Sequence, residues 1–261
     1  AYVRRQRQMC IRDRGNTIIQ NLDLKIKSGE WVGIIGSNGS GKSTLLKGIA
    51  KIIPTQNGEI LINKSSMKSI NTKNLAKIIS YLPQKINSNL PITVKELVSL
   101  GRSPHKYFWE FDWSKEDFSI IKEALELCDL KKYSDYELTS LSGGQCQRAY
   151  LALTIAQKTK IILLDEPTTF LDINFQLQML DLIKTLNKKN NLTILSVIHD
   201  INLAARYCDR LAVLKEGKLL AIDKPINALS KKIIKEAFSV ESEYINTSVG
   251  KQICAIKSLN N

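Results

Sequence analysis

The sequence predicts an α/β fold built on a mostly parallel sheet, with a largely helical subdomain inserted into it. Two observations support this class. Short apolar runs alternate with helix-length segments on both sides of the chain's middle, and these runs are continuous, as in strands that are buried on both faces. Between about Lys85 and Lys158, helical patterns dominate instead. We therefore expect a parallel sheet covered by helices, interrupted by a helical subdomain over about residues 85–158.

The first part of the chain supplies strands of two kinds. Residues 22–27 alternate Leu22, Leu24 and Ile26 with charged residues, which predicts a half-buried strand that turns at residues 28–30. Later apolar runs predict buried strands, and Asn57-Gly58 is a turn signal before one of them. The expected elements are strands over Trp31–Ile35, Glu59–Ile62 and Ile78–Leu82 and a helix over Ser43–Ile53 that Pro54 stops.

The remaining elements follow the same reasoning. Helical patterns in the middle are succeeded by a renewed alternation of strand and helix, and Glu216-Gly217 marks the turn of a last hairpin. The expected helices are Val94–Leu100, Lys115–Cys128, Gly143–Gln157, Leu171–Asn187 and Ile201–Tyr207. The expected strands are Ile161–Leu164, Thr193–Ile198, Leu211–Leu214 and Leu219–Ile222.

Composition restricts the class of protein. The chain has 261 residues, enough for one domain with a subdomain, and no apolar run of the length needed to span a bilayer. Its five cysteines are scattered without a CxxC pair, which fits reduced thiols better than a disulfide framework. The net charge of +13 comes from lysines spread over the whole chain, and no nucleic-acid-binding motif accompanies it. We expect no nucleic-acid partner, while an attraction to an anionic membrane surface stays open.

Residues 1–14 stand apart from the rest. AYVRRQRQMCIRDR shows neither a helical nor a strand period and holds five arginines against one aspartate. It resembles translated adapter sequence more than native protein. We therefore expect residues 1–14 to be a non-native segment and residues 15–261 to form the domain.

The stretch GSNGSGKST matches the phosphate-binding pattern G-x-x-x-x-G-K-[ST] in full, after an expected strand and at the start of an expected helix. In such a loop, backbone N–H groups surround a phosphate and the helix N-terminus adds positive charge. Lys42 is expected to reach the β- and γ-phosphates of a nucleotide, and the Ser43 hydroxyl to bind Mg²⁺. The expected nucleotide-binding residues are Gly36, Ser37, Asn38, Gly39, Ser40, Gly41, Lys42, Ser43 and Thr44. The pattern predicts a P-loop NTPase core.

IILLDEP supplies the expected catalytic carboxylates. Its four apolar residues form a buried strand that delivers Asp165 to the carboxyl edge of the sheet, where open α/β sheets bind ligands. Asp165 can hold the Mg²⁺ shell, and Glu166 is placed to act as general base on an attacking water. The sequence therefore predicts binding and hydrolysis of a nucleoside triphosphate, with Mg²⁺ as cofactor.

A second glycine turn, LSGGQ from Leu141 to Gln145, precedes the expected helix over residues 143–157. Together with GSNGSGKST, LLDEP, Gln84 and His199, it resembles the ATP-binding subunit of ABC transporters over nearly all of the chain after Gly15. The resemblance implies the ABC ATPase fold, with an antiparallel β subdomain beside the P-loop core and the helical subdomain. It also implies ATP as the nucleotide.

In that family, two copies pack head to tail around two ATP molecules, and the signature turn of one copy grips the γ-phosphate held by the other. The resemblance therefore implies a homodimer in which Ser142, Gly143, Gly144 and Gln145 contact the partner's ATP. By the same resemblance, Gln84 senses Mg²⁺ and water, His199 contacts the γ-phosphate and orients Glu166, and Asp172 couples the two sites.

Two positions depart from the family pattern. Arg14 stands roughly where an aromatic residue commonly stacks on adenine, so either Arg14 stacks on the base or the native aromatic was lost with the first strand. Cys146 follows LSGGQ where a basic residue is common. A thiol near a helix N-terminus can have a lowered pKa, so Cys146 is either an alkylation-sensitive residue or an inert one.

Finer similarity concerns the kind of transporter. GRSPH at 101–105, LDEPTTFLDI at 164–173 and HDINLAARYCDR at 199–210 resemble the importer group for iron-siderophores, haem and vitamin B12. This resemblance implies a peripheral subunit on the cytoplasmic side of the membrane, docked on separate permease subunits and served indirectly by a substrate-binding protein. The permease would dock on about residues 85–113, whose aromatic cluster is either an anchoring surface or ordinary core: Tyr107, Phe108, Trp109, Phe111 and Trp113. A zinc or manganese importer subunit and a non-transport ATPase such as an iron–sulfur assembly scaffold remain as alternatives.

Overall fold

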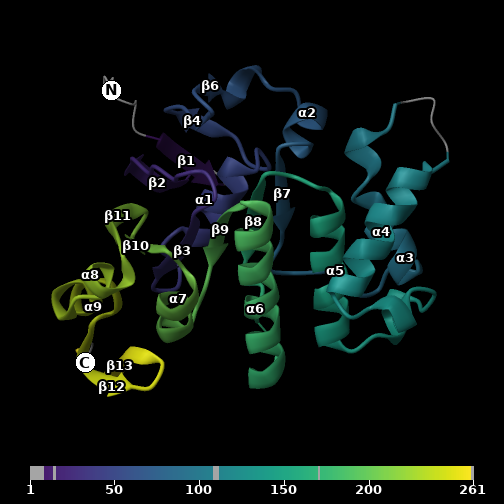
Figure 1. Ribbon diagram of the computed structural model, residues 1–261. Coiled ribbons are helices and arrows are strands. Elements are labelled where there is room, and N and C mark those ends of the chain that lie inside the picture. The colour runs from purple at the N-terminus through teal and green to yellow at the C-terminus, as the bar shows by residue number, and fades with distance from the viewer. Residues whose placement is uncertain (1–8, 14–15, 108–111, 170, 260–261) are drawn as a thin grey trace. The chain divides into compact units, whose positions relative to one another are not determined.

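The computed structural model describes residues 9–13, 16–107, 112–169 and 171–259. The chain forms two compact units (Figure 1). The first comprises Ala1–Ile70 and Thr193–Asn261, and the second comprises Asn71–Leu192. The predicted helical subdomain lies within the second unit, and its boundaries at residues 85 and 158 stay a prediction.

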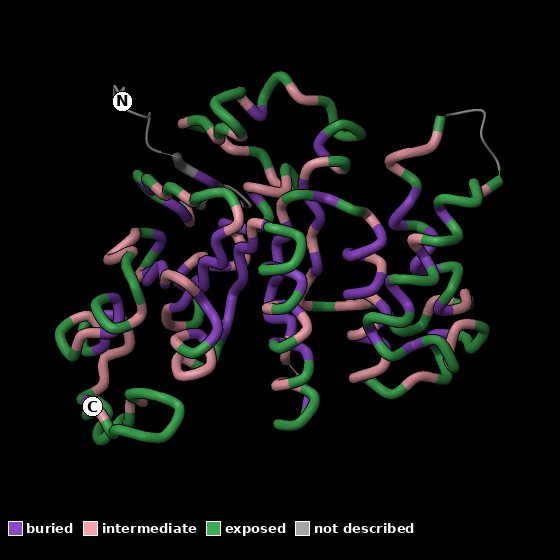
Figure 2. The backbone as a smooth tube through the Cα atoms, in the orientation of Figure 1, coloured by how far each residue is buried: buried purple, intermediate pink, exposed green. Residues whose placement is uncertain are grey.

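In the first unit, the central strands lie in the order β11-β10-β3-β9. β10 and β9 run parallel to β3 on either side, whereas β11 pairs antiparallel with β10. β3 is a buried apolar run, and its side chains are the core on which the unit is built (Figure 2). The strands are β3 (Trp31–Gly36), β9 (Thr193–Val197), β10 (Arg210–Lys215) and β11 (Lys218–Asp223).

Among its described residues, the same unit contains three antiparallel sheets besides this one. β1 pairs with both β2 and β4, which forms a three-stranded antiparallel sheet, as expected of an antiparallel β subdomain. The strands are β1 (Met9–Asp13), β2 (Asn16–Leu22), β4 (Thr55–Asn57), β5 (Leu61–Ile62), β6 (Ser65–Ser66), β12 (Val240–Thr247) and β13 (Gly250–Ser258). The helices are α1 (Lys42–Ile49), α7 (Ile201–Tyr207), α8 (Pro225–Ala228) and α9 (Lys231–Phe238).

In the second unit, β7 (Ile79–Leu82) and β8 (Ile161–Asp165) pair in parallel, with Leu82 opposite Leu164. Helices α3 and α4 both pack on α5, which forms the helical part of this unit (Figure 1). The helices are α2 (Thr72–Ala76), α3 (Val94–Leu100), α4 (Lys115–Leu127), α5 (Gly143–Ala156) and α6 (Ile173–Asn190). Within the described residues, no helix combines the length and the apolarity that crossing a bilayer requires.

Several expected elements need correction. The predicted strand over residues 22–27 is wrong, because β2 ends at Leu22, although Leu24 and Ile26 are still half-buried. Apolar and charged residues alternate there because the segment packs Leu24 and Ile26 on the core, although it forms no strand. The first helix ends at Ile49 rather than Ile53, since Lys51 adopts a left-handed conformation with φ of 59° and the N–H of Ile52 bonds back to Lys47.

The absence of a strand period in residues 1–14 was also misleading, because β1 forms there. Its pairing with β2 and β4 uses backbone groups, which a side-chain period does not report. Ile11 in this strand is fully buried. Whether the segment is native stays a prediction. The sequence analysis also missed α2, α8, α9 and the C-terminal hairpin β12–β13.

Candidate active site

The loop between β3 and α1 has the backbone geometry of a phosphate-binding loop. Gly41 precedes the helix with φ of 95°, and no side chain caps the first turn of α1. A helix that begins this way directs backbone N–H groups and the positive end of its dipole toward a ligand. An anion is therefore the natural partner of this helix N-terminus.

Two contacts fix the shape of the loop. A Cβ at Gly36 would lie 2.2 Å from the carbonyl oxygen of Leu214 in β10, so only glycine fits there. Lys42 is buried, and its Nζ donates to the carbonyl oxygens of Gly36 and Ser37 at 2.9 and 2.8 Å. The predicted residues Gly36–Thr44 thus lie together, with the lysine folded over its own loop.

Asp165 ends β8 in the second unit and Glu166 follows it, and both are almost fully buried. The hydroxyl of Tyr81 donates to Oδ2 of Asp165 at 3.1 Å. Burial, and then the charge of Asp165 and this hydrogen bond, raise the pKa of Tyr81 far above its usual value. Tyr81 therefore stays a neutral donor and holds Asp165 as an anion.

Glu166 has two side-chain partners. Nε2 of Gln84 donates to Oε2 of Glu166 at 2.7 Å, and the hydroxyl of Thr169 donates to the same oxygen at 3.0 Å. The backbone of Glu166 is left-handed, with φ of 54°. Both donors orient the carboxyl group, as a positioned general base requires. The structure thus brings together two of the predicted catalytic residues, Gln84 and Glu166.

The parallel register explains why Gln84 meets Glu166. Ile79 lies opposite Ile161 and Leu82 opposite Leu164, a constant offset that places Gln84 level with Glu166 just beyond the strands. Pairing the two predicted strands in parallel would have found this contact. Tyr81 and Thr169 were missed because no motif assigned either of them a role, although Tyr81 lies on β7 in the same register.

The donors of the second unit suit the expected cation. Asp165 offers carboxylate oxygens, the ligand type that Mg²⁺ prefers, and in the first unit Ser43 offers a hydroxyl. The buried hydroxyl of Ser40 in the P-loop has no protein hydrogen-bond partner, as expected of a group inside an anion-binding loop. The residues present therefore fit a magnesium-bound phosphate.

The signature turn begins α5 as predicted. Oγ of Ser142 accepts from the N–H of Gln145 at 3.3 Å, and Oε1 of Gln145 accepts from the N–H of Ser142 at 2.9 Å, a capping box. Ser142 and Gly143 are exposed, and nothing lies within 4 Å of a Cβ built on Gly143. The turn is thus preformed and accessible.

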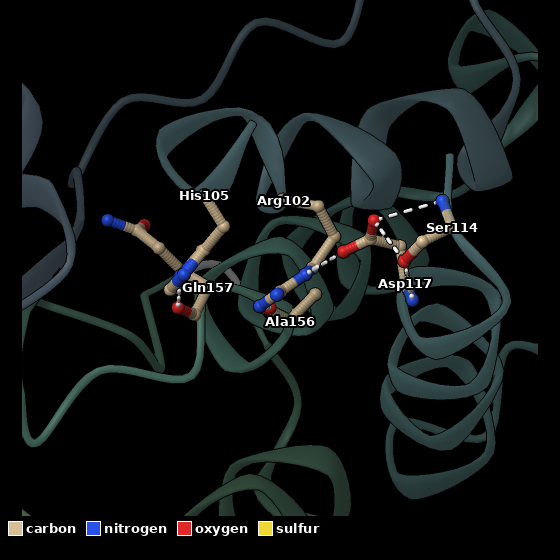
Figure 3. Close-up of polar contacts among 6 residues, drawn as sticks. All are labelled: Arg102, His105, Ser114, Asp117, Ala156 and Gln157. Carbon is tan, nitrogen blue, oxygen red and sulfur yellow. Dashed lines mark hydrogen bonds and ion pairs between the residues drawn. The ribbon is translucent and has the colours of Figure 1, made fainter. Parts of the chain in front are cut away.

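The other end of α5 is anchored by GRSPH (Figure 3). Arg102 is buried and donates through Nε to Asp117 at 2.7 Å and through Nη1 to the carbonyl of Ala156 at 2.9 Å. Nε2 of His105 bonds to the carbonyl of Gln157 at 2.9 Å. Burial alone would raise the pKa of Asp117, but hydrogen bonds from Arg102 and Ser114 and the charge of Arg102 lower it below its usual range. The side chains of Arg102 and His105 therefore satisfy the last carbonyls of the helix that carries the signature.

Cys146 is fully buried in α5, and its burial raises the pKa of the thiol. The low-pKa, alkylation-sensitive interpretation is therefore wrong, because burial outweighs the helix N-terminus, and the inert alternative holds. Arg14 and most of the aromatic cluster, Phe108, Trp109 and Phe111, lie outside the described residues.

The remaining predicted site residues lie at the ends of elements. Asp172 is exposed and caps α6 by accepting from the N–H of Phe175 at 3.0 Å. In the first unit, His199 is exposed and lies between β9 and α7. Asp200, next to it, caps α7 by accepting from the N–H groups of Asn202 and Leu203.

Comparison with known proteins supports the same conclusion. The profile of the family described as ABC transporter matches residues 19–169, more than half of the chain. The petrobactin import ATP-binding protein FpuC of Bacillus anthracis is 44% identical over 230 residues, which are 88% of this chain and 84% of FpuC. The iron(3+)-hydroxamate import ATP-binding protein FhuC of Bacillus subtilis is 38% identical over 238 residues, 91% of this chain and 88% of FhuC.

Among solved structures, a dimeric ATP-binding cassette in a post-hydrolysis state with ADP and Pi is similar to this chain. It has a TM-score of 0.71 and 30% identity, and the match covers 84% of this chain and 96% of that one. The P-loop, the carboxylates and the signature turn are therefore those of one family. The chain belongs to the ABC transporter family and is one of its ATP-hydrolysing subunits.

Proposed function

We propose that this chain is the ATP-hydrolysing motor of an importer for iron-siderophore complexes. The observation that carries the proposal is its similarity to FpuC and FhuC over about nine-tenths of its length. GRSPH, which in this structure anchors the signature helix, belongs to the segments that resemble the same importer group. The cargo does not contact this chain, so its identity is proposed from these relatives alone.

We propose that the P-loop and the carboxylates of Asp165 and Glu166 take part in ATP hydrolysis. Lys42 and the amides of the loop would bind the phosphates, and Ser43, Asp165 and Gln84 would hold Mg²⁺. When bound, Mg²⁺ would neutralise charge on the transferring phosphoryl group. The buried carboxylate of Asp165, kept anionic by Tyr81, supports this assignment.

Glu166 would act as general base. A water oxygen attacks the γ-phosphorus, its proton passes to Glu166, and the bond to ADP breaks. Gln84 and Thr169 hold the carboxylate in place through Oε2, which orients it as the base. His199 would contact the γ-phosphate and complete the site.

The signature residues Ser142, Gly143, Gly144 and Gln145 would grip ATP bound by a second copy, and Asp172 would couple the two sites. The exposure of Ser142, Gly143 and Asp172 in this chain and the dimeric relative support this arrangement. Closure of such a dimer on ATP would move permease subunits docked on about residues 85–113, because ATP binds the closed form more tightly. The chain would then work at the cytoplasmic face of the membrane, with a substrate-binding protein delivering the cargo to the permease.

The test is uptake of labelled ferric siderophore by cells whose only copy carries Glu166→Gln. Turnover of ATP should fall roughly 10²–10⁴-fold, because the amide cannot accept the proton. Uptake should stop while the permease is still present, and Glu236→Gln, at an exposed glutamate, should change neither. Normal uptake with turnover lost would remove iron-siderophore import and point to haem, vitamin B12 or another metal.

A further inference from the structure

Asn202 joins the start of α7 to the C-terminal hairpin. Its Nδ2 donates to the carbonyl oxygen of Ile253 at 3.2 Å, and its Oδ1 accepts from the N–H of Ile253 at 2.8 Å. One side-chain amide therefore takes both backbone groups of one residue. Asn202 lies three residues after His199, and all of these residues belong to the first unit.

The hairpin geometry explains why the contact has this form. β12 and β13 make a two-stranded sheet in which Ile253 lies opposite Tyr244. In an antiparallel pair, alternate residues direct both backbone groups toward the partner strand or both away from it. Because Asn202 bonds to both the N–H and the C=O of Ile253, these two backbone groups point away from β12. The side-chain amide thus closes part of the free edge of β13, as a further strand would.

Both sides of this contact are anchored. The hydroxyl of Tyr244 donates to the carbonyl of Leu229 at 2.7 Å, and the N–H of Leu259 donates to the carbonyl of Ser239 at 2.8 Å. The first bond ties the middle of β12 to the segment before α9, and the second ties the base of the hairpin to the residue that ends α9. Asp200 in turn caps the turn that carries Asn202. The His199 segment is therefore held by β9 on one side and by a hairpin-anchored helical turn on the other.

We propose that Asn202 is a positioning residue for His199, and that the β12–β13 hairpin thereby sets the rate of ATP turnover. The inference rests on the proposed role of His199 in hydrolysis. Nothing in the hairpin needs to contact ATP. Its backbone fixes the first turn of α7, and the turn fixes the loop from which His199 acts. Affinity for ATP depends on the P-loop, so the hairpin should change the rate of turnover and not binding.

The first variant is Asn202→Leu, which keeps the shape of the side chain and removes both hydrogen bonds. We expect kcat, expressed per ATP-binding site, to fall roughly three- to ten-fold, the net effect of one or two hydrogen bonds. The dissociation constant for ATP should stay unchanged. Asn246→Leu is the matched control, because Asn246 is exposed in the same hairpin. A purely structural effect would lower the number of binding sites instead of kcat per site.

The second variant reaches the same contact from the hairpin. Ile253→Pro removes the N–H that Asn202 accepts, and proline is tolerated where a strand's N–H points away from its partner. Ala255→Pro is its control, since Ala255 is two residues along β13 and faces the same way without Asn202. We expect Ile253→Pro to lower kcat and Ala255→Pro to leave it unchanged. The double variant with Asn202→Leu should be no slower than the slower single variant.

His199→Ala, measured alongside, separates this inference from the proposed function. If His199→Ala is slow while Asn202→Leu and Ile253→Pro turn over at the wild-type rate, the positioning role is overturned and the role of His199 stands. If His199→Ala itself turns over normally, both are overturned. Additive losses in the double variant would also contradict a shared contact.

Discussion

The P-loop of the first unit and the Glu166 cluster of the second are built in different ways. The loop consists of nine consecutive residues, and its shape depends on backbone conformation at glycines and on a lysine bonded to its own carbonyls. The cluster gathers side chains from three places: Gln84 beyond β7, Glu166 beyond β8, and Thr169 in the following turn. One contiguous motif thus forms the P-loop, whereas side chains from separate segments form the Glu166 cluster.

This difference implies that the P-loop and the Glu166 cluster should fail in different ways. Damage to the loop should abolish ATP binding, because the backbone itself is the binding surface. Damage to the cluster should leave binding intact and slow the chemical step. Variants of the P-loop and of the Glu166 cluster, measured for both ATP affinity and turnover rate, test this difference.

The largest effect is expected for Gly36→Ala. The added Cβ would lie 2.2 Å from the backbone oxygen of Leu214 and 2.8 Å from Oγ of Ser40, so the loop must move. We expect ATP affinity to fall about 100-fold or more, since backbone strain and the lost loop shape add together. Fluorescent-nucleotide titration would measure it. Gly250→Ala is the control, because Gly250 also has a positive φ of 111° but nothing within 4 Å.

A smaller effect is expected for Thr169→Val, which removes one hydrogen bond to Glu166 without changing side-chain volume. We expect kcat to fall roughly three- to ten-fold with ATP affinity unchanged, the scale of one typical intramolecular hydrogen bond. Steady-state turnover and nucleotide titration provide the two numbers. Thr185→Val serves as control, since the exposed Thr185 bonds only to the carbonyl of Asp181 in α6. A weaker ATP affinity in Thr169→Val would show that the P-loop and the Glu166 cluster are not separable.

The smallest effect is expected for Tyr81→Phe, and it depends on pH. The pKa of Tyr81 is raised in the folded protein above its value of about 10 in the unfolded chain. Just above pH 10, the hydroxyl therefore keeps its proton in the folded state and loses it in the unfolded state. The stabilisation is complete below pH 10 and is lost as pH rises beyond it. Tyr81→Phe should therefore be less stable by about 1 kcal/mol at neutral pH.

Above pH 10, the stability curves of wild type and Tyr81→Phe should converge. Urea unfolding at a series of pH values would show this. Tyr136→Phe, at an exposed tyrosine, should run parallel to wild type throughout. Curves for Tyr81→Phe that stay parallel above pH 10 would contradict the bond between Tyr81 and Asp165.

The sequence was most informative where chemistry is contiguous. The buried strands β3 and β8, the helices α3, α5 and α7, and the P-loop were all predictable, because each is specified by neighbouring residues. The contacts of Tyr81 with Asp165 and of Thr169 with Glu166 were not predictable in this way. Tyr81 reaches Asp165 through the pairing of two strands, and Thr169 reaches Glu166 through the turn after β8. The hairpin β12–β13 was missed because its strands are largely exposed and lack a clear alternation.

The left-handed backbone of Glu166 has an evolutionary consequence. An L-residue in that conformation costs about 1–2 kcal/mol relative to glycine, so selection for stability alone would replace the glutamate. On the proposed role of Glu166 as general base, selection on activity would keep it there and offset this cost. A homologue that no longer hydrolyses ATP would then be expected to replace the glutamate by glycine or asparagine. On that proposal, the residue at position 166 would distinguish chains that still hydrolyse ATP from those that do not.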